Sequence, residues 1–308
     1  DNKTMSKLND AIRIMIGGMF IIAAILKLIS IDEFEIYIYS FNVFSFLVTT
    51  FVSRLLIAGE FILGLFLILK INYKFTWRAT LIMLMFFTLF LIYVAIFRND
   101  DNCHCFGELV ELSPVESIVK NVVMMALLLL VRQRVNETTR QRVRCSLLIV
   151  TCTLIIVFVV SPPDVIYNKI YSSEKEISSR ALQKSFDDIV KINFENDSIS
   201  FDSTSVFKPD EGSQMIAIVS SGCKYCKIGV KKLSMMMERN DGNYDDVDIF
   251  IWGSPEGIVN FRRETLTEGY SYWHIMPNKA IDITYGRFPT FITINGDEIV
   301  EVGDFRSL

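Results

Sequence analysis

Long apolar runs in the first half of the chain constrain its fold more than any other feature. A helix needs about 20 predominantly apolar residues to cross the hydrocarbon core of a membrane, and the backbone polar groups in that core must be paired within the segment. Hydrophobic residues make up 51% of the 308-residue chain, a share too high for an ordinary soluble enzyme. We therefore expect five membrane-spanning helices, at residues 11–29, 51–69, 80–97, 115–131 and 145–160.

Basic residues cluster before the first span and in the turns between spans two and three and between spans four and five. Short loops rich in Lys and Arg face the cytoplasm. We therefore expect a multi-pass protein of the inner (cytoplasmic) membrane with a cytoplasmic N-terminus. Residues 99–114 and everything after Ser161 then lie on the periplasmic or extracytoplasmic side, and residues 36–48 form a re-entrant or interfacial segment there. The basic residues are Lys3, Lys7, Arg13, Lys70, Lys74, Arg78, Arg132, Arg134, Arg140, Arg142 and Arg144.

A change to polar composition after Ser161-Pro162-Pro163 marks the end of the membrane part, because proline cannot continue a helix. We expect a transmembrane helical domain at 1–161, a stalk or linker at 162–188 and an α/β domain at 189–308. The expected elements are an amphipathic helix at 172–188, a hairpin at 190–201, strands at 215–219, 247–252, 290–295 and 298–302, and a helix at 230–239.

A Cys-x-x-Cys pair, Cys223 and Cys226, directly follows the expected strand at 215–219 and precedes a helix. Cys223 would sit at a helix N-terminus, where unpaired backbone N–H groups and the helix dipole stabilise a thiolate. Cys226, one turn further on, could then attack a mixed disulfide on Cys223 and release the partner. A zinc half-site or a structural disulfide is the alternative, although no second Cys-x-x-Cys or Cys-x-x-His follows at zinc spacing.

The segment Gly286-Arg-Phe-Pro289-Thr-Phe lies at the start of a core strand and resembles the cis-proline segment of thioredoxin-like proteins. In that family the cis-proline lies against the active cysteines; an edge-strand proline is the alternative. From about residue 189 the chain resembles the thioredoxin-like superfamily, especially its membrane-tethered extracytoplasmic members. It departs from the superfamily at Ser221-Gly222, where a Trp usually precedes the first cysteine, and in a long insert at 254–283.

A second cysteine pair, Cys103 and Cys105, lies in the expected outer loop, within the sequence Cys-His-Cys-Phe-Gly. A disulfide across one intervening residue closes a very small ring and should be strained and easily reduced. The pair could therefore accept electrons from the Cys-x-x-Cys. A static structural loop is one alternative. A zinc site that includes His104 is another, although adjacent ligands rarely complete a tetrahedral centre, and we expect no metal.

The Cys-x-Cys-Phe-Gly loop resembles that of MauE/DoxX-type membrane proteins, which are related in plan to vitamin K epoxide reductase-like enzymes. The resemblance covers spans one to four, so it predicts a four-helix core to which a fifth span is added. It implies disulfide formation in exported proteins, with quinone from the membrane pool as the electron acceptor. His104 stands where a small residue is expected. Further matches are Arg13, Gly17, Gly18, Lys27 and Leu28 in the first span and Glu60 and Gly64 in the second.

Glu60 falls in the middle of the second expected span, where an ionisable group is costly unless it faces a cavity or a partner. Either Lys27 or Arg54 could pair with it. Glu60 could take part in quinone or proton handling, or it could brace helix packing. Cys145 and Cys152 share one helical face but lie about 10 Å apart along it, so they cannot bridge each other and we expect them to be small core residues.

These patterns predict a fused disulfide-forming system, with a helical membrane bundle followed by an α/β thioredoxin-like domain. Electrons would pass from exported cysteine-containing proteins to Cys223 and Cys226, then to Cys103 and Cys105, and finally to quinone. One alternative is a reductive thiol relay for cytochrome maturation or isomerisation, and another is a membrane assembly factor that carries no electrons. The net charge of −4 gives no reason to expect a nucleic-acid partner.

Overall fold

The computed structural model forms two compact units, Asp1–Pro163 and Asp164–Leu308. The expected stalk helix at 172–188 and hairpin at 190–201 lie outside the residues that the structure describes, and the three-part domain division remains a prediction. The described residues are 2–98, 103, 105–107, 112–131, 139–164, 166–167, 213–240, 242–295 and 298–308, without the side chains of 2–6, 139–144, 213 and 298.

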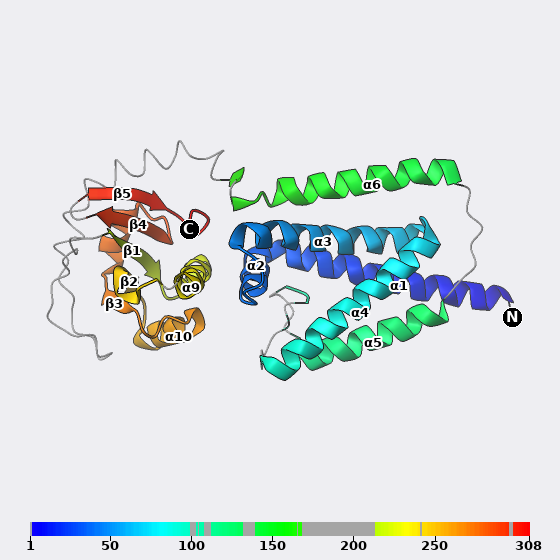
Figure 1. Ribbon diagram of the computed structural model, residues 1–308, viewed down its shortest axis with the longest axis horizontal. Helices are drawn as coiled ribbons and strands as arrows, with labels where there is room; N and C mark the ends of the chain where they lie inside the picture. Colours follow the sequence, from blue (N-terminus) through cyan, green and yellow to red (C-terminus); the bar gives the residue numbers. More distant parts are fainter. Residues whose placement is uncertain are drawn as a thin grey trace. The chain divides into compact units, whose positions relative to one another are not determined.

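The N-terminal unit is helical throughout its described elements (Figure 1). Among the residues that the structure describes, three helical stretches are long and apolar enough to cross a membrane, Lys7–Ile29, Phe46–Leu69 and Tyr73–Phe97, and a shorter apolar helix covers Cys145–Val160. The count of five spans therefore remains a prediction. The helices are α1 (Asn2–Ile29), α2 (Ile31–Tyr39), α3 (Phe46–Leu69), α4 (Tyr73–Phe97), α5 (Pro114–Leu130) and α6 (Thr139–Val160).

Four helix starts differ from those expected from the sequence. Helix α1 begins at Asn2, α3 at Phe46, α4 at Tyr73 and α6 at Thr139, each several residues before the apolar run that predicted it. The segment expected at 36–48 is divided between the end of α2, an irregular turn and the start of α3. Hydropathy marks the apolar centre of a helix, whereas the helix itself continues through polar and aromatic residues at its ends.

Four helices of the N-terminal unit share one core. Helices α1, α3, α4 and α5 all contribute buried side chains to it, and α6 packs against α3. Helices α1 and α3 approach most closely at Gly17 and Gly64, because a Cβ atom on either glycine would lie 2.7 Å from the other glycine's carbonyl oxygen. Small residues allow such close packing of helices in a membrane. The core residues are Ile16, Phe20, Leu67, Tyr73, Leu84, Met124 and Leu128.

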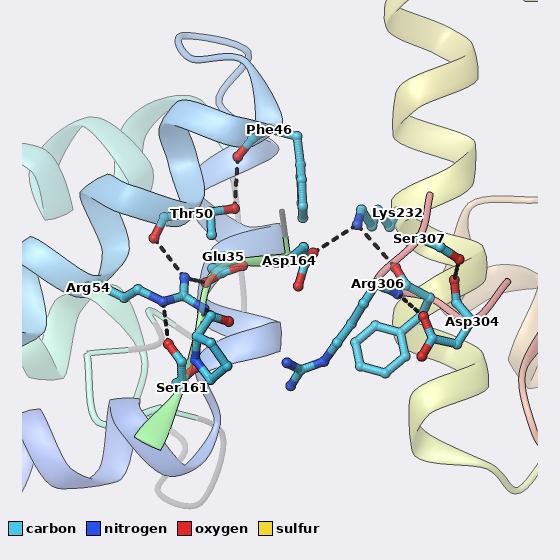
Figure 2. A network of polar contacts seen from close by, with 12 residues as sticks. Glu35, Phe46, Thr50, Arg54, Ser161, Asp164, Lys232, Asp304, Arg306 and Ser307 are labelled. Carbon is cyan, nitrogen blue, oxygen red and sulfur yellow. Dashed lines mark hydrogen bonds and ion pairs between the residues drawn. The ribbon is translucent and has the colours of Figure 1, made fainter. Parts of the chain in front are cut away.

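Buried arginines link the ends of these helices. Arg13 of α1 donates to the carbonyl oxygens of Leu67 and Ile68 at the C-terminus of α3, where helical carbonyls lack partners and the dipole favours a cation. Arg54 of α3 pairs with Glu35 of α2 and donates to the carbonyl of Ser161 at the end of α6 over 2.6 Å (Figure 2). The last helix of the unit is thereby fixed to α3.

The C-terminal unit contains a five-stranded sheet in the order β3-β2-β1-β4-β5. Strands β1, β2 and β3 are parallel, and β4 pairs antiparallel with both β1 and β5. The described elements are β1 (Ser213–Ser220), α9 (Lys224–Arg239), the 3-10 turn η1 (Tyr244–Asp246), β2 (Val247–Trp252), α10 (Pro255–Thr265), β3 (Ser271–His274), α11 (Pro277–Thr284), β4 (Thr290–Asn295) and β5 (Glu298–Gly303).

Helices cover both faces of this sheet. Ala217 and Val219 of β1 join one core with buried residues of α9 and α10, whereas Ile216 and Ile218 join another with residues of α11, as the period-2 alternation of a strand requires. On the outer side of α9, the buried Lys232 donates to the carbonyl of Phe305 over 3.0 Å (Figure 2).

Two features of this unit differ from the expected element bounds. Helix α9 begins at Lys224 with Cys223 as its N-cap, as the Cys-x-x-Cys motif predicted, and not at residue 230, where the hydrophobic pattern placed its start; Cys226 therefore lies in its first turn. The region 254–283, expected as an insert, contains α10, the edge strand β3 and α11. Strand β3 has four residues, too few for a clear alternating pattern.

The close approach of α1 and α3 gives a test of the membrane unit. Gly17→Ala places a methyl group against the Gly64 backbone and should lower the free energy of unfolding by about 1–3 kcal/mol through overpacking. Gly18→Ala is the matched control, because no atom lies within 4 Å of its Cβ position. Both changes raise helix propensity equally. Thermal unfolding of the full-length protein in detergent, followed by circular dichroism, compares them; equal stability would contradict the packing.

Candidate redox sites

The Cys-x-x-Cys pair lies where β1 ends and α9 begins. Cys223 is the N-cap residue of α9, and its Sγ accepts a hydrogen bond from the backbone N–H of Cys226 over 3.3 Å. The N–H of Cys223 in turn donates to the carbonyl of Ser220 at the end of β1. Cys226 is fully buried, whereas Cys223 is partly exposed. One sulfur of the pair is therefore accessible and the other is held inside the fold.

The two thiols differ in acidity. The hydrogen bond from the Cys226 thiol, with backbone N–H groups of α9, lowers the pKa of Cys223 to about 6. Burial, with that same hydrogen bond, raises the pKa of Cys226 well above its ordinary value. A thiolate is the nucleophile in disulfide exchange. At neutral pH these pKa values favour a thiolate at Cys223 and a protonated thiol at Cys226.

The Phe288–Pro289 peptide bond is cis, as the sequence analysis expected. Strand β4 begins at the next residue, and its register pairs Thr290 with Ile218 of β1. Pro289 therefore lies beside the carboxyl end of β1, from which the cysteine turn emerges. The partly buried side chains of Phe288 and Cys223 pack against the same core cluster.

The loop between α4 and α5 holds the second cysteine pair. The N–H of Cys103 donates to the carbonyl of Leu112 over 2.9 Å, which closes the loop just before α5. The N–H of Cys105 donates to Cys103 Sγ over 3.3 Å, and the hydroxyl of Ser117 lies 2.9 Å from the same sulfur. Cys103 is only 3% exposed, and Cys105 is more accessible.

These contacts also make the pKa values of the two loop thiols differ. Hydrogen bonds from the Cys105 thiol and then from Ser117 lower the pKa of Cys103 to about 6. The pKa of Cys105 is raised, first by its hydrogen bond to Cys103 and then by burial. The loop pair therefore also consists of one stabilised thiolate and one protonated thiol.

Gly107 explains why the Cys-x-Cys-Phe-Gly loop ends in glycine. Its φ of +68° lies in the left-handed region, and a Cβ atom there would lie 2.7 Å from the carbonyl oxygen of Leu26 and overlap the hydroxyl of Ser30. Glycine alone accommodates both constraints without strain. The loop is thereby seated on the C-terminal end of α1.

Both loop cysteines line a cavity of about 520 Å³ inside the N-terminal unit. Its volume falls within the usual range of small-molecule sites, about 300–1,000 Å³. The walls are mostly apolar and rich in aromatic rings, and they include Lys27, Glu60 and Lys120. The aromatic lining residues are Phe20, Phe34, Tyr37, Phe41, Phe44, Phe86, Phe87, Phe90, Tyr93 and Phe106.

Glu60 is buried and forms a two-pronged ion pair with Lys27 of α1, whose Nζ lies 2.6 and 2.7 Å from the two carboxylate oxygens. Arg54 pairs with Glu35 instead, so the structure selects Lys27 from the two partners considered for Glu60. Ser117 and Lys120 were not predicted from the sequence. The helix-start pattern Ser-Pro-x-Glu before them marks the start of α5, but it does not specify that Ser117 lies against Cys103.

The remaining sequence predictions concern Cys145 and Cys152 on α6 and a metal site at His104. Cys145 and Cys152 are both exposed on α6, so the expectation of core cysteines is wrong; α6 packs mainly against α3, which leaves much of its surface uncovered. His104 lies outside the described residues. Within the residues that the structure describes, no group of three or more His, Cys, Asp or Glu side chains is arranged to hold a metal ion.

The acidity of Cys223 gives a direct test of the soluble pair. Because its pKa is lowered to about 6, the thiolate is present above that pH and is lost as the pH falls through it. Alkylation of Cys223 by iodoacetamide, followed by mass spectrometry of the reduced full-length protein, should rise around pH 6 and then level off. Cys226→Ala should move the midpoint upward by about one unit or more, whereas Cys152→Ala should not. A wild-type midpoint near 9 would contradict the geometry.

Comparisons with known proteins agree with this architecture. Residues 5–132 match the family described as Methylamine utilisation protein MauE. Over 299 residues the chain is 28% identical to Protein TlpB of Flavobacterium psychrophilum, an alignment that covers 85% of this chain and 81% of that protein. No solved structure gives a significant match. The N-terminal part of the chain is thus a MauE-type membrane domain, fused to a C-terminal α/β domain.

Proposed function

We propose that this protein is a membrane-bound thiol–disulfide oxidoreductase that forms disulfides in exported proteins. The observation that carries the proposal is that both cysteine pairs combine a stabilised thiolate, Cys223 or Cys103, with a protonated partner, and that the second pair lines an aromatic cavity. In this scheme the α/β domain is thioredoxin-like. Its support is the order of a strand, the Cys-x-x-Cys turn and a helix, with Pro289 beside the same end of the sheet.

The first exchange takes place between the oxidised Cys223–Cys226 pair and two thiols of an exported protein. A substrate thiolate attacks Sγ of Cys223, the Cys223–Cys226 bond breaks, and Cys226 leaves and is protonated. The second substrate thiolate then attacks the mixed disulfide and releases Cys223 as a thiolate. Two electrons move from the substrate to the pair; of the two protons that the substrate thiols lose, one is bound by Cys226 and the other goes to solvent. Because stabilisation of the Cys223 thiolate favours the reduced form, it makes the pair oxidising.

The second exchange returns the Cys223/Cys226 pair to its disulfide at the expense of a Cys103–Cys105 disulfide. Two electrons pass to the loop pair, which becomes the dithiol. The expected placement of both pairs on the extracytoplasmic side, with the N-terminus in the cytoplasm of an inner-membrane protein, rests on the distribution of Lys and Arg.

Quinone fits the residues of the cavity as the final electron acceptor. Aromatic side chains offer faces on which a planar ring can stack, and Lys27, Lys120 and Glu60 supply a few polar groups within an apolar wall, the usual pattern of a cofactor site. A quinone supplies two-electron acceptance, so the dithiol becomes a disulfide and hydroquinone is the product. Glu60, held by Lys27, would then serve as a charged wall residue near the site of proton uptake.

Substitution of the loop cysteines tests the relay. Cys103→Ser and Cys105→Ser should each block the reoxidation of Cys223/Cys226 in membranes, so that this pair accumulates as the dithiol after one exchange with a reduced protein. The measurement is thiol trapping with a mass tag at successive times. Cys145→Ser and Cys152→Ser are matched controls on α6 and should reoxidise at the wild-type rate.

The two alternative functions, a membrane assembly factor and a reductive thiol relay, predict different results in the same thiol-trapping experiment. Reoxidation at the wild-type rate in both loop variants would exclude the relay and favour a membrane assembly factor. A Cys223/Cys226 pair that is reduced at rest, and becomes oxidised only when an electron donor is removed, would favour the reductive thiol relay.

A further inference from the structure

Helix α5 presents two polar side chains to the loop cysteines, and the proposed function gives neither of them a role in the cysteine chemistry. Ser117 is fully buried, and its hydroxyl lies 2.9 Å from Cys103 Sγ. Lys120 follows three residues later, on the same helical face, and lines the cavity together with both cysteines. Its Nζ lies 4.3 Å from the centre of the Phe106 ring, next to Cys105 in the chain.

The start of α5 fixes these side chains in place. Ser113 and Glu116 form a reciprocal capping box, and Pro114 occupies the first helical turn, all of which favour a helix start at this point. The loop is attached to the same point through the hydrogen bond from Cys103 to the carbonyl of Leu112. The distance between Ser117 and Cys103 is therefore set by local structure at both ends.

Lys120 differs from the other lysine of the cavity. Lys27 is held by both carboxylate oxygens of Glu60, so its charge is largely compensated. Among the described residues, no carboxylate lies within ion-pair distance of Lys120. Its charge is therefore available to an anion in the cavity, where a cation attracts more strongly than in water because the surroundings are apolar.

We propose that Ser117 and Lys120 are positioning residues that hold Cys103 as the thiolate of the loop pair, so that Cys103 reacts inside the cavity and Cys105 exchanges with Cys223. The proposal rests on the proposed function only in that it takes the loop pair as redox-active. The burial of Cys103 agrees with a reaction inside the cavity, and the greater accessibility of Cys105 agrees with exchange with an outside thiol.

The exchange then has a defined sequence. The Cys223 thiolate attacks Sγ of Cys105, the Cys103–Cys105 bond breaks, and Cys103 leaves as a thiolate stabilised by Ser117 and Lys120. Cys226 next attacks Cys223, which forms the Cys223–Cys226 disulfide and releases Cys105 to be protonated. A more acidic thiol is a better leaving group. With a quinone as acceptor, the Cys103 thiolate and the Cys105 thiol would give up two electrons and one proton, solvent would supply the second proton, and the loop disulfide would form again.

The charged and titratable groups around Cys103 come from every helix that borders the cavity. They determine the pH profile that the test measures, and a change in any of them could shift it. They are Cys105 in the loop, Lys27 from α1, Tyr37 from α2, Glu60 from α3, Tyr93 from α4 and Lys120 from α5.

The test is the pH profile of Cys103 alkylation by iodoacetamide in the reduced full-length protein, read by tandem mass spectrometry. Because the pKa of Cys103 is lowered to about 6, the wild-type midpoint should lie near pH 6. Ser117→Ala and Lys120→Met should each raise it by about one unit, which slows alkylation below the midpoint about tenfold. Ser117→Thr and Lys120→Arg, which keep the hydroxyl and the charge, should return it toward the wild-type value. Thr151→Ala on α6 removes a distant hydroxyl and should change nothing.

An unchanged midpoint in folded Ser117→Ala and Lys120→Met would overturn the proposal. If Ser117→Ala fails to fold, the comparison of Lys120→Met with Lys120→Arg decides alone. Reoxidation of Cys223/Cys226 is measured in the same membranes. If the variants shift the Cys103 midpoint but the wild type does not reoxidise Cys223/Cys226, the proposed function is overturned and the roles of Ser117 and Lys120 are upheld. If the wild type reoxidises this pair but the variants do not shift the midpoint, the proposed function is upheld and the roles of Ser117 and Lys120 are overturned.

Discussion

The ion pair between Lys27 and Glu60 is the interaction on which the membrane unit depends most. A single charge buried among apolar membrane helices is costly. An ion pair is tolerated there only where its geometry and hydrogen bonds compensate for the lost hydration of both groups. Here Lys27 reaches both oxygens of Glu60 and lies near the rings of Phe34 and Phe87. Loss of either partner would leave the other charge buried and unpaired, so the pair sets the register of α1 against α3.

That register positions the remainder of the site. Ser30 and Leu26, on either side of Lys27, form the surface on which Gly107 is seated. The cysteine loop therefore docks on the end of α1 that the ion pair fixes, and Glu60 and Lys27 form part of the wall of the same cavity. The two cysteine pairs are built differently, since a helix cap holds Cys223 and a docked loop with Ser117 holds Cys103. Both arrangements nevertheless produce one acidic and one protonated thiol.

The sequence predicted local features well and long-range ones poorly. The Cys-x-x-Cys turn and the cis bond before Pro289 were accessible because they depend on short motifs beside apolar strands. The Cys-x-x-Cys motif predicted the start of α9 at Cys223, whereas the hydrophobic pattern placed it at residue 230, because the polar residues Lys224 and Lys227 interrupt that pattern in the first turn. Ser117 could not be identified as a contact of Cys103, since the two residues meet only after the loop folds back onto α5. The pairing of Glu60 with Lys27, not Arg54, depends on how α1 crosses α3, which single-sequence patterns do not specify.

The central claim is that electrons leave exported proteins through both pairs toward quinone, and the redox state of each pair in native membranes tests it most directly. Thiols are trapped with acid and tagged by mass, with the quinone pool held either oxidised or reduced. The account predicts that Cys223/Cys226 rests as the disulfide while the pool is oxidised, and accumulates as the dithiol when the pool is reduced. A pair that rests reduced beside an oxidised pool would contradict it.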